Sequence, residues 1–248
     1  MILLPKTRSA MPFQYRPFVC SVIVGLLPAV VALATEPPAK NRRPDPKRFE
    51  QAIVAFERRD RENPPPRGAV VVTGSSSVRM WHDTIRRDLA PLTIIPRGFG
   101  GSTMNDLLYY ADRVIVRYRP RAVVIYEGDN DTHFGLAPAE IRDTFTRLVA
   151  KLHQHDPNMR IYFLAIKPSP RRQAIWPQAR QTNRLIEELC RNDSRLFYID
   201  VATPMLDEAG NPKTELFIDD RLHMNRKGYE LWTKIVRPVL LKHEQVAK

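Results

Sequence analysis

Ser76 lies where the sequence changes from a buried strand to a helix, and a serine in that position can do chemistry. The apolar, β-branched run from Val70 ends at Gly74, three serines follow, and an amphipathic pattern begins at Val78. This order predicts a parallel strand, a tight turn and a helix start, with Ser76 at the carboxyl edge of a sheet, where open α/β sheets bind ligands. Ser76 is thus a candidate nucleophile, although a serine there can also act only as a helix cap. The G-x-S-x-G elbow is not formed, because Val78 stands in place of its second glycine.

Three later segments supply candidate partners for Ser76. The glycines of RGFGGST, which include Gly101, leave backbone N–H groups accessible to a ligand. Asn130, in YEGDND, follows an apolar run and can aim an amide N–H at a developing oxyanion. Asp220 and His223 are three residues apart, so the carboxylate can hold one ring nitrogen and leave the other to accept a serine proton. Turn propensity alone also accounts for each of these segments.

The spacing argues against two other uses of these segments. A dinucleotide fingerprint, G-x-G-x-x-G, requires glycine where Thr103 stands. The group Asp129, Asp131 and His133 suggests a metal, but it fits neither an EF-hand loop nor a His-x-x-x-His helix. We therefore expect no cofactor and no metal ion.

Five β-rich runs alternate with amphipathic helical patterns from Gly68 onward. This alternation favours an α/β fold, a parallel sheet covered by helices on both faces and joined by right-handed crossovers. The irregular segments 167–176 and 201–225 are expected to lie over the site. The predicted strands cover residues 69–73, 92–95, 122–126, 161–165 and 196–199, and the predicted helices cover residues 78–89, 104–117, 138–155, 177–191 and 226–241.

The first 34 residues have the layout of a secretory signal peptide. Basic residues precede an apolar run over residues 18–34, which contains Pro28 and closes in small residues. This run is shorter than the roughly 20 residues of a spanning helix, so we expect cleavage after Ala34 and an exported, periplasmic or extracellular protein; an uncleaved anchor is the alternative. Residues 35–66 are expected to form a Pro-rich tether and an N-terminal helix, and residues 67–245 the main domain.

The chain carries a formal net charge of +12, which suits contact with anionic surfaces. The basic residues are scattered and match no nucleic-acid motif, so we expect no nucleic-acid partner, and at most peripheral contact with an anionic cell envelope. Cys190 is the single cysteine beyond the predicted signal peptide, so it is expected to pack as a small apolar residue.

In combination, the segments GSSSVRMW, RGFGGST, YEGDND, AIKPSP and LFIDDRLHMNRKGYELW resemble the SGNH (GDSL-type) hydrolase family. The resemblance extends over nearly all of the chain after the signal peptide, from FEQAIVAFERRDRENPPP onward. It implies a three-layer α/β/α sandwich with a five-stranded parallel sheet in flavodoxin-like order. It also implies that Ser76 is the nucleophile, His223 the general base and Asp220 its orienting carboxylate. The oxyanion hole would consist of the Ser76 and Gly101 N–H groups and the Asn130 side chain.

Two positions depart from the family's pattern. Ser75 replaces the aspartate of G-D-S, which resembles a G-S-S-S subgroup, and Pro96 stands where relatives often have asparagine. Glu127 either adds negative charge near the site or faces solvent at a strand end. Trp176 either stacks on a sugar or fixes its loop to the core.

The resemblance implies hydrolysis of a small-molecule or carbohydrate ester. No long apolar lid segment is evident, which favours a short acyl group. An O-acyltransferase that uses the same three side chains and a noncatalytic envelope binding module are the alternatives.

Overall fold

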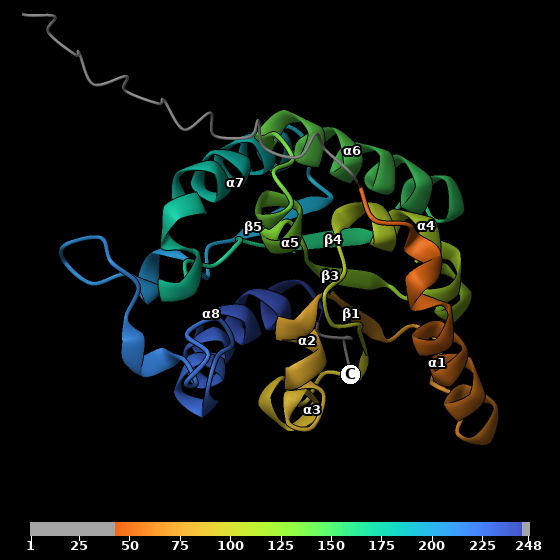
Figure 1. Cartoon of the computed structure of the whole chain (residues 1–248). Coiled ribbons are helices and arrows are strands. Elements are labelled where there is room, and N and C mark those ends of the chain that lie inside the picture. The colour runs from red at the N-terminus through yellow and green to blue at the C-terminus, as the bar shows by residue number, and fades with distance from the viewer. Residues whose placement is uncertain (1–42, 245–248) are drawn as a thin grey trace, which may run out of the picture. The chain divides into compact units, whose positions relative to one another are not determined.

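The computed structural model describes residues 43–244 (Figure 1). The predicted signal peptide and residues 35–42 of the tether lie outside the described residues, so the cleavage after Ala34 stays a prediction. Within residues 43–244, no helix combines the length and the apolar character that crossing a membrane requires.

Five parallel strands form one sheet in the order β2-β1-β3-β4-β5. This is the flavodoxin-like order, and the predicted five-stranded parallel sheet is confirmed. Because β1 pairs with both β2 and β3, the residues that follow β1 emerge near the middle of the carboxyl edge. The strands are β1 (Val70–Gly74), β2 (Ile94–Gly98), β3 (Ala122–Tyr126), β4 (Arg160–Leu164) and β5 (Leu196–Ile199).

Helices cover both faces of this sheet, as Figure 1 shows. Successive strand residues point to opposite faces, so Val71 and Val123 belong to one buried cluster and Val72 and Val124 to the other. The first cluster includes residues of α1 (Glu50–Glu62), α4 (Met104–Val114), α6 (Pro138–His155) and α7 (Trp176–Arg191), and the second includes residues of α2 (Ser76–Trp81), α3 (Ile85–Asp88) and α8 (Arg226–Glu244). The three-layer α/β/α architecture is therefore confirmed.

The N-terminal helical segment begins at Pro46, and Asp45 caps it. The Asp45 side chain accepts a hydrogen bond from the Lys47 N–H at 2.9 Å, and Pro46 opens a 3-10 turn, η1 (Pro46–Phe49), that leads into α1. Ile53 and Phe56 of α1 are buried against the sheet layer, and the helix ends at Glu62 before the prolines. Cys190, on α7, is buried as expected, and burial raises the pKa of its thiol to about 12.

The prediction of one helix over residues 78–89 is wrong. The chain forms α2 and α3 with a break between Trp81 and Ile85. Tertiary contacts accompany this break, since the Asp88 carboxylate accepts hydrogen bonds from the Trp81 indole N–H and the Thr84 hydroxyl, each at 2.8 Å. Helical periodicity reports which residues face the core, and it cannot report such side-chain contacts.

Two predicted boundaries also shift. The second strand runs to Gly98, beyond the predicted residue 95, and it tolerates Pro96 because β2 is an edge strand. The helix after it ends at Val114, short of residue 117, where Ile115 leaves the helical region and a 3-10 turn, η2 (Val116–Tyr118), follows. The remaining 3-10 turns are η3 (Pro170–Ile175), η4 (Thr203–Met205) and η5 (Thr214–Leu216).

The end of β2 packs closely on α2 at Gly98. A Cβ atom on Gly98 would lie 2.7 Å from the carbonyl carbon of Val78 and closer still to the Arg79 nitrogen. The Gly98 N–H donates a hydrogen bond to Nε2 of His82 at 2.9 Å, so the residue that follows α2 is fixed to the strand that carries the glycine loop.

Gly98→Ala should lower the free energy of unfolding by about 2 kcal/mol, because the backbone of α2 must move to admit a methyl group. Gly100→Ala is the matched control, since its Cβ would lie 3.8 Å from the nearest heavy atom, Cβ of Ser76. Urea unfolding of both variants measures the difference. Equal midpoints would contradict the tight approach of α2 to β2.

The stability of the fold should fall with pH between about 6.5 and 4 because of His82. Burial, followed by the nearby charges of Arg79 and Arg59, lowers the pKa of His82 to about 4 from 6.5. Between these pH values the unfolded chain binds a proton that the folded chain does not. The contribution of neutral His82 to the free energy of unfolding is therefore complete above pH 6.5 and is lost as the pH falls toward 4. The loss should approach about 3 kcal/mol.

His82→Gln is the control for this pH dependence. A glutamine oxygen can still accept the Gly98 N–H but does not titrate, so the variant should lose less stability over the same pH range. Unfolding free energies at several pH values measure the difference, and parallel curves for the two proteins would overturn the assignment.

Candidate active site

Ser76 is the first residue of α2, two residues beyond the end of β1. Gly74 makes the turn with φ of 140°, and the Ser75 N–H donates to the Tyr126 carbonyl oxygen at 3.1 Å, which fixes the turn to β3. The Ser76 N–H lies in the first turn of a helix, so it has no carbonyl partner within that helix. Both its hydroxyl and its N–H are therefore presented at the carboxyl edge of the sheet.

The structure brings His223 and Asp220 to this hydroxyl. Nε2 of His223 lies 2.9 Å from Oγ of Ser76, although the two residues are 147 positions apart in the sequence. Nδ1 of His223 lies 2.5 Å from Oδ2 of Asp220. The three side chains thus form a hydrogen-bonded series from carboxylate to imidazole to hydroxyl.

Backbone contacts hold Asp220 in an ionised state. Its Oδ1 accepts the N–H groups of Leu222 and His223, each at 2.9 Å, across a turn in which Arg221 has φ of 58°. Partial burial would raise the pKa of Asp220, but the hydrogen bonds from the His223 ring and from these N–H groups lower it to about 2. Asp220 is therefore negatively charged beside the imidazole at neutral pH.

The Asn130 side chain is held by contacts on both of its polar atoms. Asn130 lies in a short helix that the sequence analysis did not predict, α5 (Asp129–His133), which begins after β3. Nδ2 donates to the Ser102 carbonyl oxygen at 2.8 Å, and Oδ1 accepts from Nη2 of Arg172 at 3.0 Å. Because Arg172 can only donate, its contact identifies the oxygen of the amide and leaves one N–H of Nδ2 available.

Gly101 lies in the loop after β2, next to the turn that carries Ser76. It has φ of 85°, a conformation that favours glycine, and no heavy atom lies within 4 Å of the position that its Cβ would take. No acceptor for its N–H is found in the described part of the chain. The structure therefore places Ser76, Gly101 and Asn130 just after the neighbouring strands β1, β2 and β3.

The sequence analysis missed a buried ion cluster beside Asn130. Nη1 of Arg172 lies 2.6 Å from Oδ1 of Asp129, and Nζ of Lys167 lies 3.6 Å from Oδ2 of the same carboxylate. Nζ of Lys167 also donates to the Leu222 carbonyl oxygen at 2.9 Å, one residue before His223. The cluster therefore connects the Asn130 loop to the loop of His223.

These cations determine the charge of Asp129. Burial opposes ionisation, but Lys167 and Arg172 lower the pKa of this carboxyl below its usual value. In sequence, the only signal was that the AIKPSPRR segment, which carries both cations, follows a predicted strand.

Glu127 does not face solvent. Its side chain is fully buried, and Oε1 lies 2.5 Å from Oγ of Ser102. Burial, and then the nearby Asp131 carboxyl, raises the pKa of Glu127 well above its ordinary value, which favours the neutral acid. The interpretation that Glu127 faces solvent at a strand end is therefore wrong.

The acids that suggested a metal are used in other contacts. Asp129 is paired with two cations, and Asp131 is buried and accepts the Met104 N–H at 3.0 Å through Oδ2. Burial raises the pKa of Asp131 to about 7. Over residues 43–244, no three His, Cys, Asp or Glu side chains are grouped so as to hold a metal ion.

Trp176 opens α7 and packs, partly buried, against both buried clusters. These contacts favour the role of fixing the preceding loop to the core.

A cavity of about 480 Å³ lies beside the loop of His223 and the Arg172 side chain. It reaches Leu222, the neighbour of His223, and Arg172, which holds Asn130. Its lining consists of His133, Arg171, Arg172, Ala174, Ile175 and Leu222.

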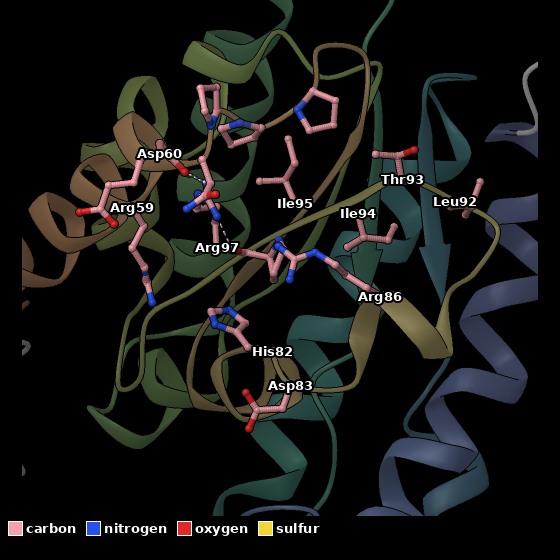
Figure 2. A pocket seen from close by; sticks show the side chains of 16 residues that line it. Arg59, Asp60, His82, Asp83, Arg86, Leu92, Thr93, Ile94, Ile95 and Arg97 are labelled. Atoms are coloured by element: carbon pink, nitrogen blue, oxygen red, sulfur yellow. Dashed lines mark hydrogen bonds and ion pairs between the residues drawn. The ribbon is translucent and has the colours of Figure 1, made fainter.

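A larger cavity, of about 720 Å³, lies elsewhere, and Figure 2 shows the side chains around it. Neither Ser76, Asp220 nor His223 lines it. Arginines and carboxylates alternate on its walls, and Arg97 there is paired with Asp60. None of the three candidate catalytic residues lines the smaller cavity either, but the larger one also lacks any neighbour of His223 and any residue that contacts Asn130. The smaller cavity is therefore the one next to the candidate active site.

Comparison with known proteins gives the same fold. Among solved structures, the chain is similar to a GDSL-like lipase from Bacteroides thetaiotaomicron, with a TM-score of 0.62 and 18% identity over 80% of this chain and 98% of that one. A lipase/acylhydrolase from Enterococcus faecalis gives a TM-score of 0.59 and 19% identity over 72% and 100% of the two chains. A mutant of an acetyl-xylooligosaccharide esterase from Geobacillus gives 0.56 and 14% over 74% and 96%. Identities this low show the shared fold alone.

No curated protein matches the sequence. The profile of the GDSL-like lipase/acylhydrolase family, however, matches residues 66–231, which include every strand and each of the five candidate site residues. The chain therefore belongs to the GDSL-like lipase/acylhydrolase family.

Proposed function

We propose that this protein is an exported serine esterase that hydrolyses short-acyl carboxylic esters through an acyl-enzyme on Ser76. The observation that carries the proposal is the 2.9 Å contact between Nε2 of His223 and Oγ of Ser76, with Asp220 on the other ring nitrogen. A nucleophile, a base within hydrogen-bond reach and a third group that orients the base are the parts that nucleophilic catalysis requires.

His223 first accepts a proton and then donates it. His223 accepts the Ser76 proton as the hydroxyl oxygen attacks the ester carbonyl, and it returns the proton to the alcohol that leaves. Asp220, ionised at neutral pH, stabilises the imidazolium that forms in between and keeps the free nitrogen directed at the serine. Water, activated by the same imidazole, then releases the acid from Ser76.

The negative charge on the substrate oxygen needs donors that are already in position. The N–H groups of Ser76 and Gly101 and the Asn130 amide are the proposed donors, and fixed dipoles of this kind stabilise an oxyanion better than water, which must reorient. Arg172 acts as a positioning residue, because its bond to Oδ1 keeps the Asn130 nitrogen on the side of the reaction.

Two observations support the preference for short acyl groups. The cavity beside Leu222 and Arg172 measures about 480 Å³ and is half lined by polar side chains, which suits a small polar ester. One protein of similar fold is an acetyl-xylooligosaccharide esterase, and an acetyl group is the short acyl group proposed here. Export is supported by the layout of residues 1–34 alone.

Ser76→Ala should abolish both hydrolysis of p-nitrophenyl acetate and labelling by a fluorophosphonate probe, because the attacking oxygen is removed. Ser75→Ala is the matched control, since the adjacent Ser75 hydroxyl is buried and has no hydrogen-bond partner in the described residues. Wild-type and Ser75→Ala proteins should label equally and should hydrolyse the acetate faster than the octanoate. A folded wild-type protein that takes no label would favour a noncatalytic binding module.

Asn130→Ala should lower kcat for p-nitrophenyl acetate by about a hundredfold or more, through loss of an oxyanion donor. Arg172→Gln should lower kcat by about tenfold with little change in KM, because the amide loses the contact that orients it. If Arg172 acts through Asn130, its replacement should have little further effect in the Asn130→Ala background. Full additivity of the two effects would contradict the positioning role.

A further inference from the structure

The cavity beside Leu222 has positively charged side chains in its lining and no negatively charged ones. Its six lining residues include the two arginines of the η3 turn, Arg171 and Arg172, and no carboxylate. The larger cavity of Figure 2 is balanced, because Arg59, Arg86 and Arg97 share its walls with Asp60, Glu62 and Asp83. A lining with arginines and no carboxylate therefore distinguishes the cavity beside Leu222 from the larger cavity.

The acids nearest to this cavity do not neutralise it. Asp129 lies beneath Arg172 but also faces Lys167, so one carboxylate meets two cations. Asp220 is engaged by the His223 ring at 2.5 Å and by two backbone N–H groups. Asp129 and Asp220 together balance Lys167 and Arg172, so Arg171 makes the net charge around the cavity positive.

Arg171 is the cation that remains free to meet a ligand. Its side chain is exposed and makes no hydrogen bond or ion pair with any other residue in the range 43–244. Its main chain is fixed, since the Arg171 N–H donates to the Arg221 carbonyl oxygen at 3.0 Å on the His223 loop. The backbone that carries the free Arg171 guanidinium is thus hydrogen-bonded to the loop of His223.

His133 reports the same positive potential. Burial lowers the pKa of His133, and Arg172 and Arg171 lower it further than Asp129 can offset. The neutral imidazole then adds a hydrogen-bond donor to the cavity without a charge of its own. Ala174, Ile175 and Leu222 supply an apolar wall opposite the polar groups.

We propose that this cavity binds an anionic group, a carboxylate or a phosphate, carried by the ester substrate, and that Arg171 is its main charged contact. The inference rests on the proposed function, because it names the class of ester that the Ser76 site takes: an acylated acidic sugar or sugar phosphate. A volume of about 480 Å³ accommodates one or two sugar units. Guanidinium groups suit both anions, since their N–H groups match two oxygens at once.

The test compares mono-O-acetylated glucuronate, glucose 6-phosphate and glucose, which share a sugar ring and differ in charge. Wild-type kcat/KM should be about tenfold or more higher for the charged esters, because a charge-assisted hydrogen bond is retained through binding and reaction. A preference for glucuronate alone identifies a carboxylate, and one for the phosphate alone identifies a phosphate. Equal values for the three sugars would overturn the proposal.

Arg171→Gln assigns the preference to this cavity. The substitution should raise KM for the charged esters until their kcat/KM equals that for acetylated glucose. High salt should have the same effect on the wild type, because at about 1 M salt charges are screened within about 3 Å. Arg147→Gln, an exposed arginine on α6, is the matched control and should keep the wild-type ratio. A preference that survives Arg171→Gln would refute the assignment.

The outcome can be separated from that of the proposed function. Labelling of Ser76 and hydrolysis of p-nitrophenyl acetate test the esterase, and neither substrate carries a sugar or an anion. If both succeed and the three sugars react equally, only the anion site fails. If both fail, calorimetric binding of glucuronate and glucose 6-phosphate, compared between wild type and Arg171→Gln, still tests the cavity.

Discussion

The contact between the His223 ring and the Ser76 hydroxyl is the constraint on which the rest of the site depends, because it joins loops at opposite ends of the sequence. Ser76 follows β1, which lies next to the edge strand β2, whereas His223 follows β5 at the opposite edge of the sheet. The segment after β5 must therefore cross back over the strand ends. Short 3-10 turns, the bridge between Phe217 and Met224, and the bond from Lys167 to the Leu222 carbonyl fix its course.

The buried cluster of Asp129, Arg172 and Lys167 makes this crossing and the oxyanion loop depend on each other. Charges taken out of water are costly unless each meets a partner, and loss of one partner leaves the others uncompensated. Arg172 contacts both Asp129 and Asn130, and Lys167 contacts both Asp129 and the His223 loop. A displacement of either loop would therefore separate buried charges. The cost of that separation keeps the site ordered before substrate binds.

The sequence predicted the sheet, its helical layers and the residues at its carboxyl edge, because strand ends in an α/β fold occupy one edge whatever their order. It did not predict the break after Trp81 or the burial of Glu127, since both depend on long-range side-chain partners such as Asp88 and Ser102. It identified Asn130 without Arg172, because a loop arginine has no period or spacing that indicates its contacts. The position of Ser76 followed from local pattern, whereas the groups that orient its partners are determined by tertiary packing.

The charges at the site follow from burial and explain why Ser75 is tolerated where relatives carry aspartate. Residue 75 is 1% exposed and its hydroxyl has no hydrogen-bond partner among the described residues, so an aspartate there would bury a carboxylate without a partner. Ionisation is favoured at Asp129, which two cations hold, and at Asp220, which faces the imidazole. Asp220 thus places negative charge beside the imidazole, where an imidazolium would form, whereas the charge of Asp129 beside Asn130 is offset by Lys167 and Arg172. Arg171 and Arg172, with no carboxylate in the same lining, give the neighbouring cavity its positive charge.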